Sequence, residues 1–269
     1  RIYRPGIWYL NPYLNDSNPT NISQGNSHLD SEKSHSFNLS YSNFTQKFNI
    51  NLSARYSFTN NSIEQVTEQV KDTEIEGLQN PTGKEVLYST YQNIGKSRNA
   101  SLSGYVNWNA TSNTRIYANL YGNYTYMEGA NGLKNDGWNL FAYGGAQQSL
   151  PHDWRISLNI YGQTPWIMLQ GKGSSFFDYG LSVNKSFLNK RLTLSAFASN
   201  FFKKYTSPTS SIEGVGFTQD SWNRYTRQRF GVSVSYRIGE LKAGVKKAAR
   251  TISNDDVKGG GGEGGGGGE

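Results

Sequence analysis

The stretch FNINLSARYSF, residues 48 to 58, decides the fold class. Its even positions, from Phe48 to Phe58, are apolar, and its odd positions, from Asn49 to Ser57, are polar. Because successive side chains of a β-strand point to opposite faces, this alternation predicts a strand with one apolar and one polar face, a period that no helix has. The open question is whether the apolar face meets a protein core or lipid.

The same period of two recurs along the chain. Eight further segments alternate, although 138 to 146 does so less cleanly because Phe141 and Tyr143 oppose its other apolar residues. Together with residues 48 to 58 they predict about nine strands. The eight segments are 36 to 44, 100 to 108, 114 to 126, 138 to 146, 154 to 162, 177 to 187, 191 to 199 and 229 to 238.

The predicted connections alternate between short and long, which is the layout of outer-membrane barrels. The short turns lie near 45 and at 110 to 113, 150 to 153 and 188 to 190. The long loops cover 5 to 33, about 60 to 86, 127 to 136, 163 to 173 and 203 to 225. Five aromatic residues stand beside the short turns, and we expect them to form the inner aromatic girdle: Phe44, Phe48, Trp108, Trp154 and Phe187.

A soluble antiparallel sandwich or barrel would also alternate apolar and polar residues. Two features favour the membrane. The polar face carries Asn, Ser, Tyr and isolated Arg rather than the Lys/Glu mixture of a soluble surface. The apolar face includes small residues such as Gly104 and Ala118, which would leave voids in a packed core. We therefore predict an all-β protein, a transmembrane antiparallel β-barrel whose apolar face contacts outer-membrane lipid. The odd strand count, and the opening RIYR, which looks like the end of a strand, suggest the C-terminal part of a larger barrel.

Residues 4 to 41 resemble the Bacteroidetes outer-membrane β-barrel proteins related to TonB-dependent receptors (SusC/RagA-like). The matching elements are Arg4-Pro5, Leu10-Asn11-Pro12, Asn18-Pro19, Gly25-Asn26 and Leu29 to Ser34, with a departure at Ser27, where the family usually has Pro. Residues 90 to 108 and 230 to 239 also look like that family. The resemblance implies a 22-stranded barrel with a plug and an energy-coupling box. Neither the plug nor the box is in this sequence.

Composition limits the other classes. The chain has no cysteine, and no apolar run of about 18 residues for a helical span. The first residues show no signal-peptide features, so a leader lies upstream or this is a fragment. The charge of +7 is spread along the chain, which argues against nucleic acid as a partner.

We divide the chain into barrel with long extracellular loops (1 to 239), a basic periplasmic segment (240 to 258) and a Gly-rich disordered tail (259 to 269).

No catalytic or metal-ligating constellation stands out. His28, His35 and His152 lie in or beside loops without ligand spacing, so we expect no metal, no cofactor and no enzyme. The candidate substrate-binding residues are polar-face Arg and Tyr side chains and loop Trp side chains. Those on the polar face either line a solute path or fill the barrel and bond to a plug. The candidates are Arg55, Tyr105, Arg115, Tyr121, Arg155, Trp8, Trp166 and Trp222.

Two functions remain open at this point. The first is energy-coupled uptake of a large solute through a plugged lumen in the outer membrane. The alternative is a structural or assembly scaffold within a larger outer-membrane complex. The expected partners are outer-membrane lipid, a surface lipoprotein and a periplasmic energy-coupling or assembly protein.

Overall fold

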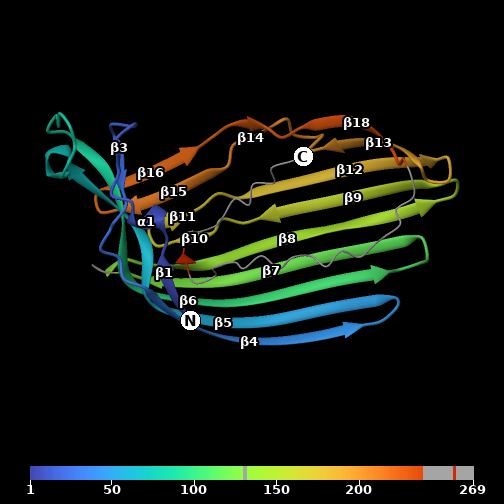
Figure 1. The fold of residues 1–269 in the computed structure, drawn as a ribbon, viewed down its shortest axis with the longest axis horizontal. Helices are drawn as coiled ribbons and strands as arrows, with labels where there is room; N and C mark the ends of the chain where they lie inside the picture. The colour runs from blue at the N-terminus through green and yellow to red at the C-terminus, as the bar shows by residue number, and fades with distance from the viewer. Residues whose placement is uncertain (130–131, 239–256, 259–269) are drawn as a thin grey trace.

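Nine long antiparallel strands make up most of a 13-stranded sheet, and each pairs with the next of the nine along the chain (Figure 1). The computed structural model describes residues 1–129, 132–238 and 257–258. All nine predicted segments form strands, which confirms the all-β fold. The strands are β4 (Glu32–Phe44), β5 (Phe48–Lys71), β6 (Glu85–Asn109), β7 (Thr114–Glu128), β8 (Lys134–Leu150), β9 (Trp154–Gln163), β12 (Phe176–Phe187), β13 (Leu192–Ser199) and β18 (Arg229–Tyr236).

The register sets apolar rows beside polar rows. Leu52 of β5 pairs with Gly104 of β6, which pairs with Leu120 of β7. In the next row Ser53 pairs with Ser103, and their hydroxyl oxygens lie 2.6 Å apart. The apolar row is uncovered, with Leu52 43% and Leu120 59% exposed. The predicted division of residues 48 to 58 into an apolar and a polar face is therefore confirmed, and the apolar face is the lipid-facing one.

The aromatic girdle at the short-turn end is formed by most of the predicted residues. Phe44 is the exception, because its pairing with Asn49 puts it on the polar face. That prediction was wrong because proximity to a turn does not fix the face; the count along β4 does. Lys185 lies on the apolar face of the girdle, with its ammonium 5.4 Å from the Trp154 ring centroid and 5.3 Å from that of Phe187. The girdle residues on the apolar face are Phe48, Trp108, Trp154 and Phe187.

A second aromatic belt marks the loop end of the sheet. Tyr124 packs on Trp138 with ring centroids 5.5 Å apart, and Phe177 packs on Tyr179 at 6.0 Å. From Phe48 to Phe58, strand β5 rises about 33 Å at about 3.3 Å per residue. At a barrel tilt of about 40° this gives a height of about 25 Å, which is the apolar band of outer-membrane barrels. In such barrels the short turns face the periplasm and the long loops face outward, so we expect the loop end, called the outer end here, to lie outside the cell.

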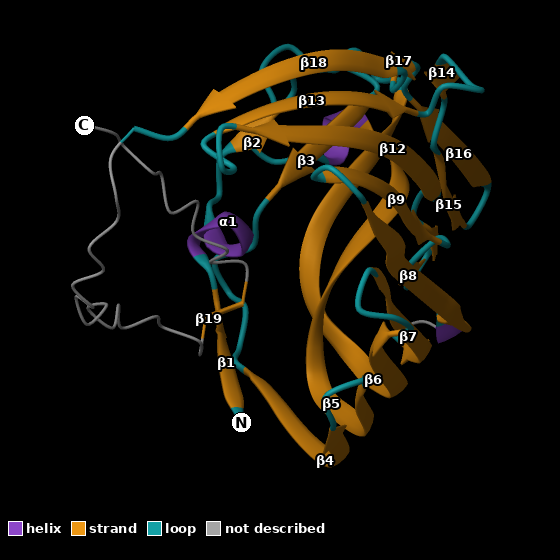
Figure 2. Ribbon diagram, turned by 90° about the vertical axis from the view of Figure 1, so that its right-hand side faces the viewer, coloured by secondary structure: helices purple, strands orange, loops and turns teal. Residues whose placement is uncertain are grey.

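Both edges of the sheet are open within the described residues. From His35 to Phe44, β4 pairs only with β5, because Arg1 and β1 (Ile2–Pro5) reach β4 only from Ser34 to Glu32. At the other edge β18 pairs only with β13. Figure 2 shows the sheet as an open arc, with β4 and β18 at its two ends and the N-terminal segment on its concave side.

Strands β5 and β6 extend well beyond the lipid band, so the predicted loop at about 60 to 86 is much shorter than expected. Their pairing continues as far as Lys71 and Glu85. Asn61 has a positive φ of 61° and the register shifts there, which is a β-bulge. Beyond the bulge, Ile63 and Val66 are buried. The apolar/polar alternation that begins at Phe48 ends at this bulge. The extra residue there exchanges the odd and even positions between the two faces of the strand.

The outer loops pack together into a canopy, defined here as the N-terminal segment, the outer part of β5–β6, and two hairpins. A small core holds it, in which Ile22, Ile75 and Val86 are buried. The Gln170 amide donates to the carbonyl of Thr67 at 2.9 Å and accepts from its N–H at 2.7 Å. The canopy elements are β1, α1 (Ile7–Leu10), β2 (Leu14–Asn15), β3 (Asn21–Gln24), β10 (Ile167–Met168), β11 (Gly171–Lys172), β15 (Thr209–Gly214) and β16 (Phe217–Trp222).

Asp72 closes the tip of the β5–β6 hairpin, in a one-turn 3-10 helix (Asp72–Glu74). Its carboxylate accepts from the N–H of Thr82 at 2.6 Å, the Thr82 hydroxyl at 2.7 Å and the N–H of Gly83 at 2.7 Å. The backbone hydrogen bond from Thr82 has the largest effect on the pKa of Asp72, and together with the other donors it lowers this pKa against the opposing effect of burial. Because the pKa of Asp72 is lower in the folded state, the ionised carboxylate stabilises the hairpin tip. This stabilisation is complete above the unfolded-state pKa of about 3.9 and is lost as the pH falls through the folded-state pKa.

We therefore expect Asp72→Asn to raise hydrogen exchange of the Thr82 and Gly83 amides at least tenfold at pH 7, because two backbone donors lose their charged acceptor. In the unmodified protein the protection should be equal at pH 7 and pH 5 after correction for intrinsic exchange. Glu74→Gln, an exposed change in the same tip, is the control. Equal exchange in both variants would contradict the role given to Asp72.

The described residues contain no helix long and apolar enough to cross a membrane. Of the predicted tail, only β19 (Val257–Lys258) is described, and it pairs in parallel with Arg4 and Pro5 of β1. These two residues therefore lie at the loop end of the sheet, not at the short-turn end where the segment 240 to 258 is predicted. The remainder of the predicted periplasmic segment and Gly-rich tail lies outside the described residues, and its placement stays a prediction.

Candidate functional site

The polar face of the sheet is the wall of a lumen, and one row of side chains crosses it from β6 to β9. Arg115 donates from Nε to Asn107 Oδ1 at 2.5 Å, and its guanidinium carbon lies 5.7 Å from the Tyr117 ring centroid. The Tyr117 hydroxyl donates to Asn159 Oδ1 at 2.5 Å. These contacts hold Arg115 and Tyr117 flat along the wall rather than pointing into the lumen.

Gly145 makes the Tyr117–Asn159 contact possible. It lies between them in the ladder, paired with Tyr117 on one side and Asn159 on the other. A Cβ at this position would lie 2.7 Å from the Tyr117 hydroxyl and 2.4 Å from the carbonyl oxygen of Leu158. Only glycine therefore leaves room for the tyrosine to cross its strand.

An aromatic row continues from Tyr117 toward the outer end of the lumen. Ring centroids are 5.7 Å apart for Tyr117 and Tyr143, 6.3 Å for Tyr143 and Tyr161, and 5.2 Å for Phe141 and Tyr161. Tyr161 then packs on Phe176 of β12 at 4.9 Å. Four of these rings come from the polar faces of three adjacent strands: Tyr117 from β7, Phe141 and Tyr143 from β8, and Tyr161 from β9. The strand register brings the four rings side by side. The result is a continuous aromatic surface along the lumen wall.

The row ends at an ion pair. Arg227 pairs with Asp178, and its guanidinium carbon lies 5.3 Å from the Phe176 ring centroid. Asn200, which has a positive φ of 49°, donates from Nδ2 to Asp178 Oδ1 at 2.7 Å and to the carbonyl of Arg227 at 3.3 Å. Three segments of the chain, from β12, from the end of β13 and from the approach to β18, thus meet at one charged junction.

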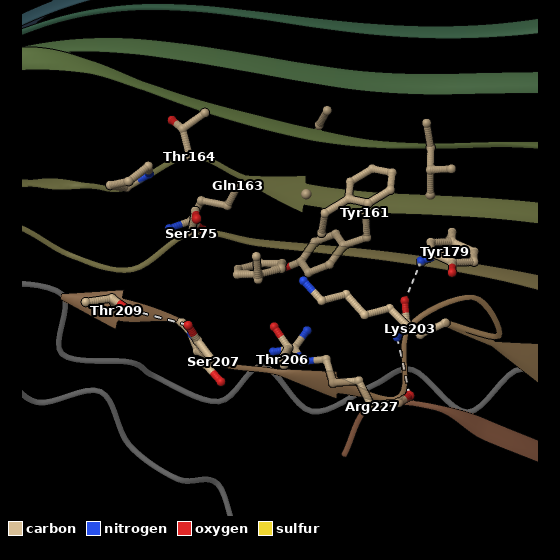
Figure 3. Close-up of a pocket in the computed structure, with 18 of the residues that line it drawn as sticks. Tyr161, Gln163, Thr164, Ser175, Tyr179, Lys203, Thr206, Ser207, Thr209 and Arg227 are labelled. Carbon is tan, nitrogen blue, oxygen red and sulfur yellow. Dashed lines mark hydrogen bonds between the residues drawn. The ribbon is translucent and has the colours of Figure 1, made fainter. Parts of the chain in front are cut away.

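Beyond this junction the wall of the sheet opens. The β12–β13 ladder stops at Gly180 and Ser199, and the strands that follow, β14 (Tyr205–Thr206) and β17 (Tyr225–Thr226), pair only with each other. A pocket of about 890 Å³ lies between the outer end of β12 and this hairpin. Figure 3 shows Lys203 and Arg227 approaching it from the hairpin side, and Gln163, Thr164 and Ser175 on the other side.

The structure puts all five predicted wall residues on the polar face but does not gather them into one site. Arg115 alone joins the contacts around Tyr117. Arg155 pairs with Ser149 near the short turns, and Arg55 pairs with Ser101 several rows further out. Tyr105 and Tyr121 are each 37% exposed toward the lumen.

The three predicted loop tryptophans lie apart in the outer loops. Trp8 is in α1 and is 74% exposed, and Trp222 ends β16 and is 64% exposed. Trp166 is 43% exposed and packs on Gly173, where a Cβ would come within 2.0 Å of its ring. Trp8 and Trp222 are therefore free to contact a ligand or partner, whereas Trp166 also has a structural contact.

The residues missed by the sequence reasoning are those of the charged junction. Asp178 occupies a polar-face position of the predicted strand 177 to 187, but Arg227 and Asn200 lie on either side of the predicted loop at 203 to 225, outside any alternating segment. Arg227 is 49 positions from Asp178 in the chain. A single arginine in a loop does not indicate in the sequence which carboxylate it pairs with. Arg227 reaches Asp178 of β12 only because β13 and β18 pair in the folded chain.

The sequence matches the outer membrane protein beta-barrel family over residues 1–236. The chain belongs to this family. As an outer-membrane β-barrel it is located in the outer membrane, and the arc of Figure 2 is part of its barrel wall. A search of curated proteins found no match.

Among solved structures, this outer-membrane barrel is similar to the copper transporter OprC. The TM-score is 0.57 at 14% sequence identity, and the match covers 87% of this chain and 36% of the transporter. The chain thus spans about a third of the length of that protein. At this identity the likeness supports the barrel fold and nothing about substrate.

Proposed function

We propose that this chain forms the C-terminal part of a TonB-dependent-receptor-like transporter, which takes up a large solute through a plugged lumen. The observation that carries the proposal is the shape of the wall. An arc of nine strands leaves β4 and β18 unpaired with each other (Figure 2). Open edges are not stable in hydrocarbon, so further strands must pair with both. A barrel that is still open after nine strands belongs to the wide class, whose lumen is channel-like or plugged.

The lining of the wall supports a lumen that is filled and regulated rather than empty. Arg55 and Arg229 lie on the polar face as exposed cations, and Tyr105 and Tyr121 present part-exposed rings. Such groups bond to the carboxylates and carbonyls of a plug or to those of a passing solute. Energy coupling through a periplasmic protein, and capture of solute with a surface lipoprotein above the canopy, belong to this same proposal.

The proposal is tested by photo-crosslinking from the wall in the full-length protein in cells. Tyr121 is replaced by p-benzoylphenylalanine, and the neighbouring Leu120, on the lipid face, is replaced in the same way as the control. The expected result is a crosslink from position 121 to an N-terminal plug on the same polypeptide, and none from position 120. Peptide mass spectrometry identifies the partner.

The alternative scaffold role predicts a different product. There position 121 would crosslink to another polypeptide, or to none, and the protein recovered from outer membranes would carry no plug. Either outcome would contradict the transporter proposal. A mass of about three times the 30.0 kDa of this chain or more, with a plug sequence, agrees with it.

A further inference from the structure

Three cations gather where the β13–β18 hairpin leaves the lipid band. Lys203, Lys204 and Arg224, here called the hairpin basic cluster, are all exposed. Within the described parts of the chain, none of the three has a carboxylate within salt-bridge distance, whereas nearby Arg227 is paired with Asp178. The cluster therefore carries a charge of about +3 without a counter-ion among the described residues.

Two of these cations converge on a single ring. The Arg224 guanidinium carbon lies 4.4 Å from the Tyr205 ring centroid, and the Lys204 ammonium lies 5.2 Å from it. The ring attracts each cation, but the two positive charges repel each other. An anion seated between them would relieve that repulsion and accept hydrogen bonds from both.

The height of the cluster indicates which anion is available. Lys203 and Lys204 directly follow Phe201 and Phe202, which pack on Tyr179 with centroid distances of 5.1 Å and 5.9 Å. Phe202 is 86% exposed, as expected of a ring in an aromatic belt. Such belts lie at the level of the lipid headgroups. The cluster therefore sits in the layer of headgroup phosphates of the outer leaflet.

The adjoining pocket combines a cation with apolar surface. Lys203 extends its side chain into the pocket in Figure 3. The lining includes Ile160, Phe177 and Tyr179 from the lipid-facing phase of the sheet. It also includes Tyr161, Phe176 and Arg227 of the lumen row, so the pocket lies where the two faces meet. A ligand that fills such a site has an anionic head and an apolar body.

We propose that the hairpin basic cluster binds the phosphate of a phosphorylated glycolipid of the outer leaflet. The phosphate contacts Lys204 and Arg224 around Tyr205, with Lys203 beside it, and the acyl chains lie along Phe177 and Tyr179. The site is at the outer rim of the barrel wall, beside this pocket, and does not depend on what the lumen transports. It tethers the hairpin, which has no ladder to β12, to the membrane surface.

The test is native mass spectrometry of the full-length protein, purified from outer membranes and titrated with bisphosphorylated lipid A. The test variant replaces Lys203, Lys204 and Arg224 by glutamine. The control replaces Lys71, Lys84 and Lys172, three exposed cations of the canopy, by glutamine, an identical charge change. Each cation near a charged headgroup layer contributes about fivefold to binding, so the test variant is expected to bind about a hundredfold more weakly and the control unchanged.

Two further arms define the ligand. Dephosphorylated lipid A is expected to bind at least tenfold more weakly than the bisphosphorylated form, and millimolar inorganic phosphate is expected not to displace it. Equal binding by the two triple variants, or by the two lipids, would overturn the proposal. Full displacement by inorganic phosphate would overturn the lipid as the source of the anion. Heat-modifiable migration in gels shows that both variants are folded.

Discussion

Replacing Gly145 by valine is expected to reduce the folded barrel in the outer membrane about a hundredfold. The new Cβ would lie 2.4 Å from the Leu158 carbonyl oxygen and 2.7 Å from the Tyr117 hydroxyl, so the strand and the tyrosine must both move. Overpacking of this kind costs about 1–3 kcal/mol, and loss of the hydrogen bond from Tyr117 to Asn159 adds about 1 kcal/mol. The folded fraction is measured by heat-modifiable gel migration of outer-membrane extracts.

Gly104→Val is the matched control for this prediction. Gly104 is also a strand glycine, but it lies on the lipid face, where an added Cβ meets only the Leu52 side chain at 3.2 Å. Its folded amount should stay within about twofold of the unmodified protein. If the two valine variants assemble equally well, the crossing of Tyr117 over Gly145 is not part of the native wall.

Leu120→Arg is expected to destabilise the barrel by about 2–4 kcal/mol, because it places a charge near the middle of the lipid-facing band. Leu120 is 59% exposed on that face and pairs with Gly104 and Ala142. The measurement is urea unfolding of the full-length protein in bilayers of fixed composition, followed by tryptophan fluorescence.

Asn119→Arg is the control at the adjacent position. Asn119 lies on the lumen face, where Arg55 and Arg115 already stand, so the same charge should cost less than about 1 kcal/mol. A larger loss of stability at position 119 than at position 120 would show that the two faces are assigned the wrong way round.

The strands were predictable because a strand in a membrane barrel needs an apolar side chain at every lipid-facing position. In a soluble protein a strand tolerates mixed faces, but here each residue from Phe48 to Phe58 obeys the period, since one face meets hydrocarbon and the other water. The short turns could be predicted as well, because they lie where one alternating segment ends and the next begins. The failure at Phe44 shows the limit of reasoning from position near a turn, because the face depends on parity and not on proximity.

The canopy and the charged junction could not be predicted in the same way. Beyond Asn61 the side chains pack against other loops instead of lipid, so period two no longer determines which are buried. The tie between Gln170 and Thr67 joins positions 103 apart, and the Arg227–Asp178 pair joins positions 49 apart. Such contacts depend on the closure of several hairpins at once, and single polar residues in loops give no sign of their partners.

The most direct test of this account is a spin-label scan of residues 48 to 58, one cysteine at a time, in the full-length protein in bilayers. These 269 residues contain no cysteine, and any cysteine elsewhere in the full-length protein is replaced by serine, so each label reports a single site. The quantity measured is the collision rate with oxygen, which concentrates in hydrocarbon. The account predicts maxima at the even positions, from Phe48 to Phe58, and minima at the odd positions, whether or not a plug fills the lumen. Maxima at the odd positions, or no period of two, would contradict it.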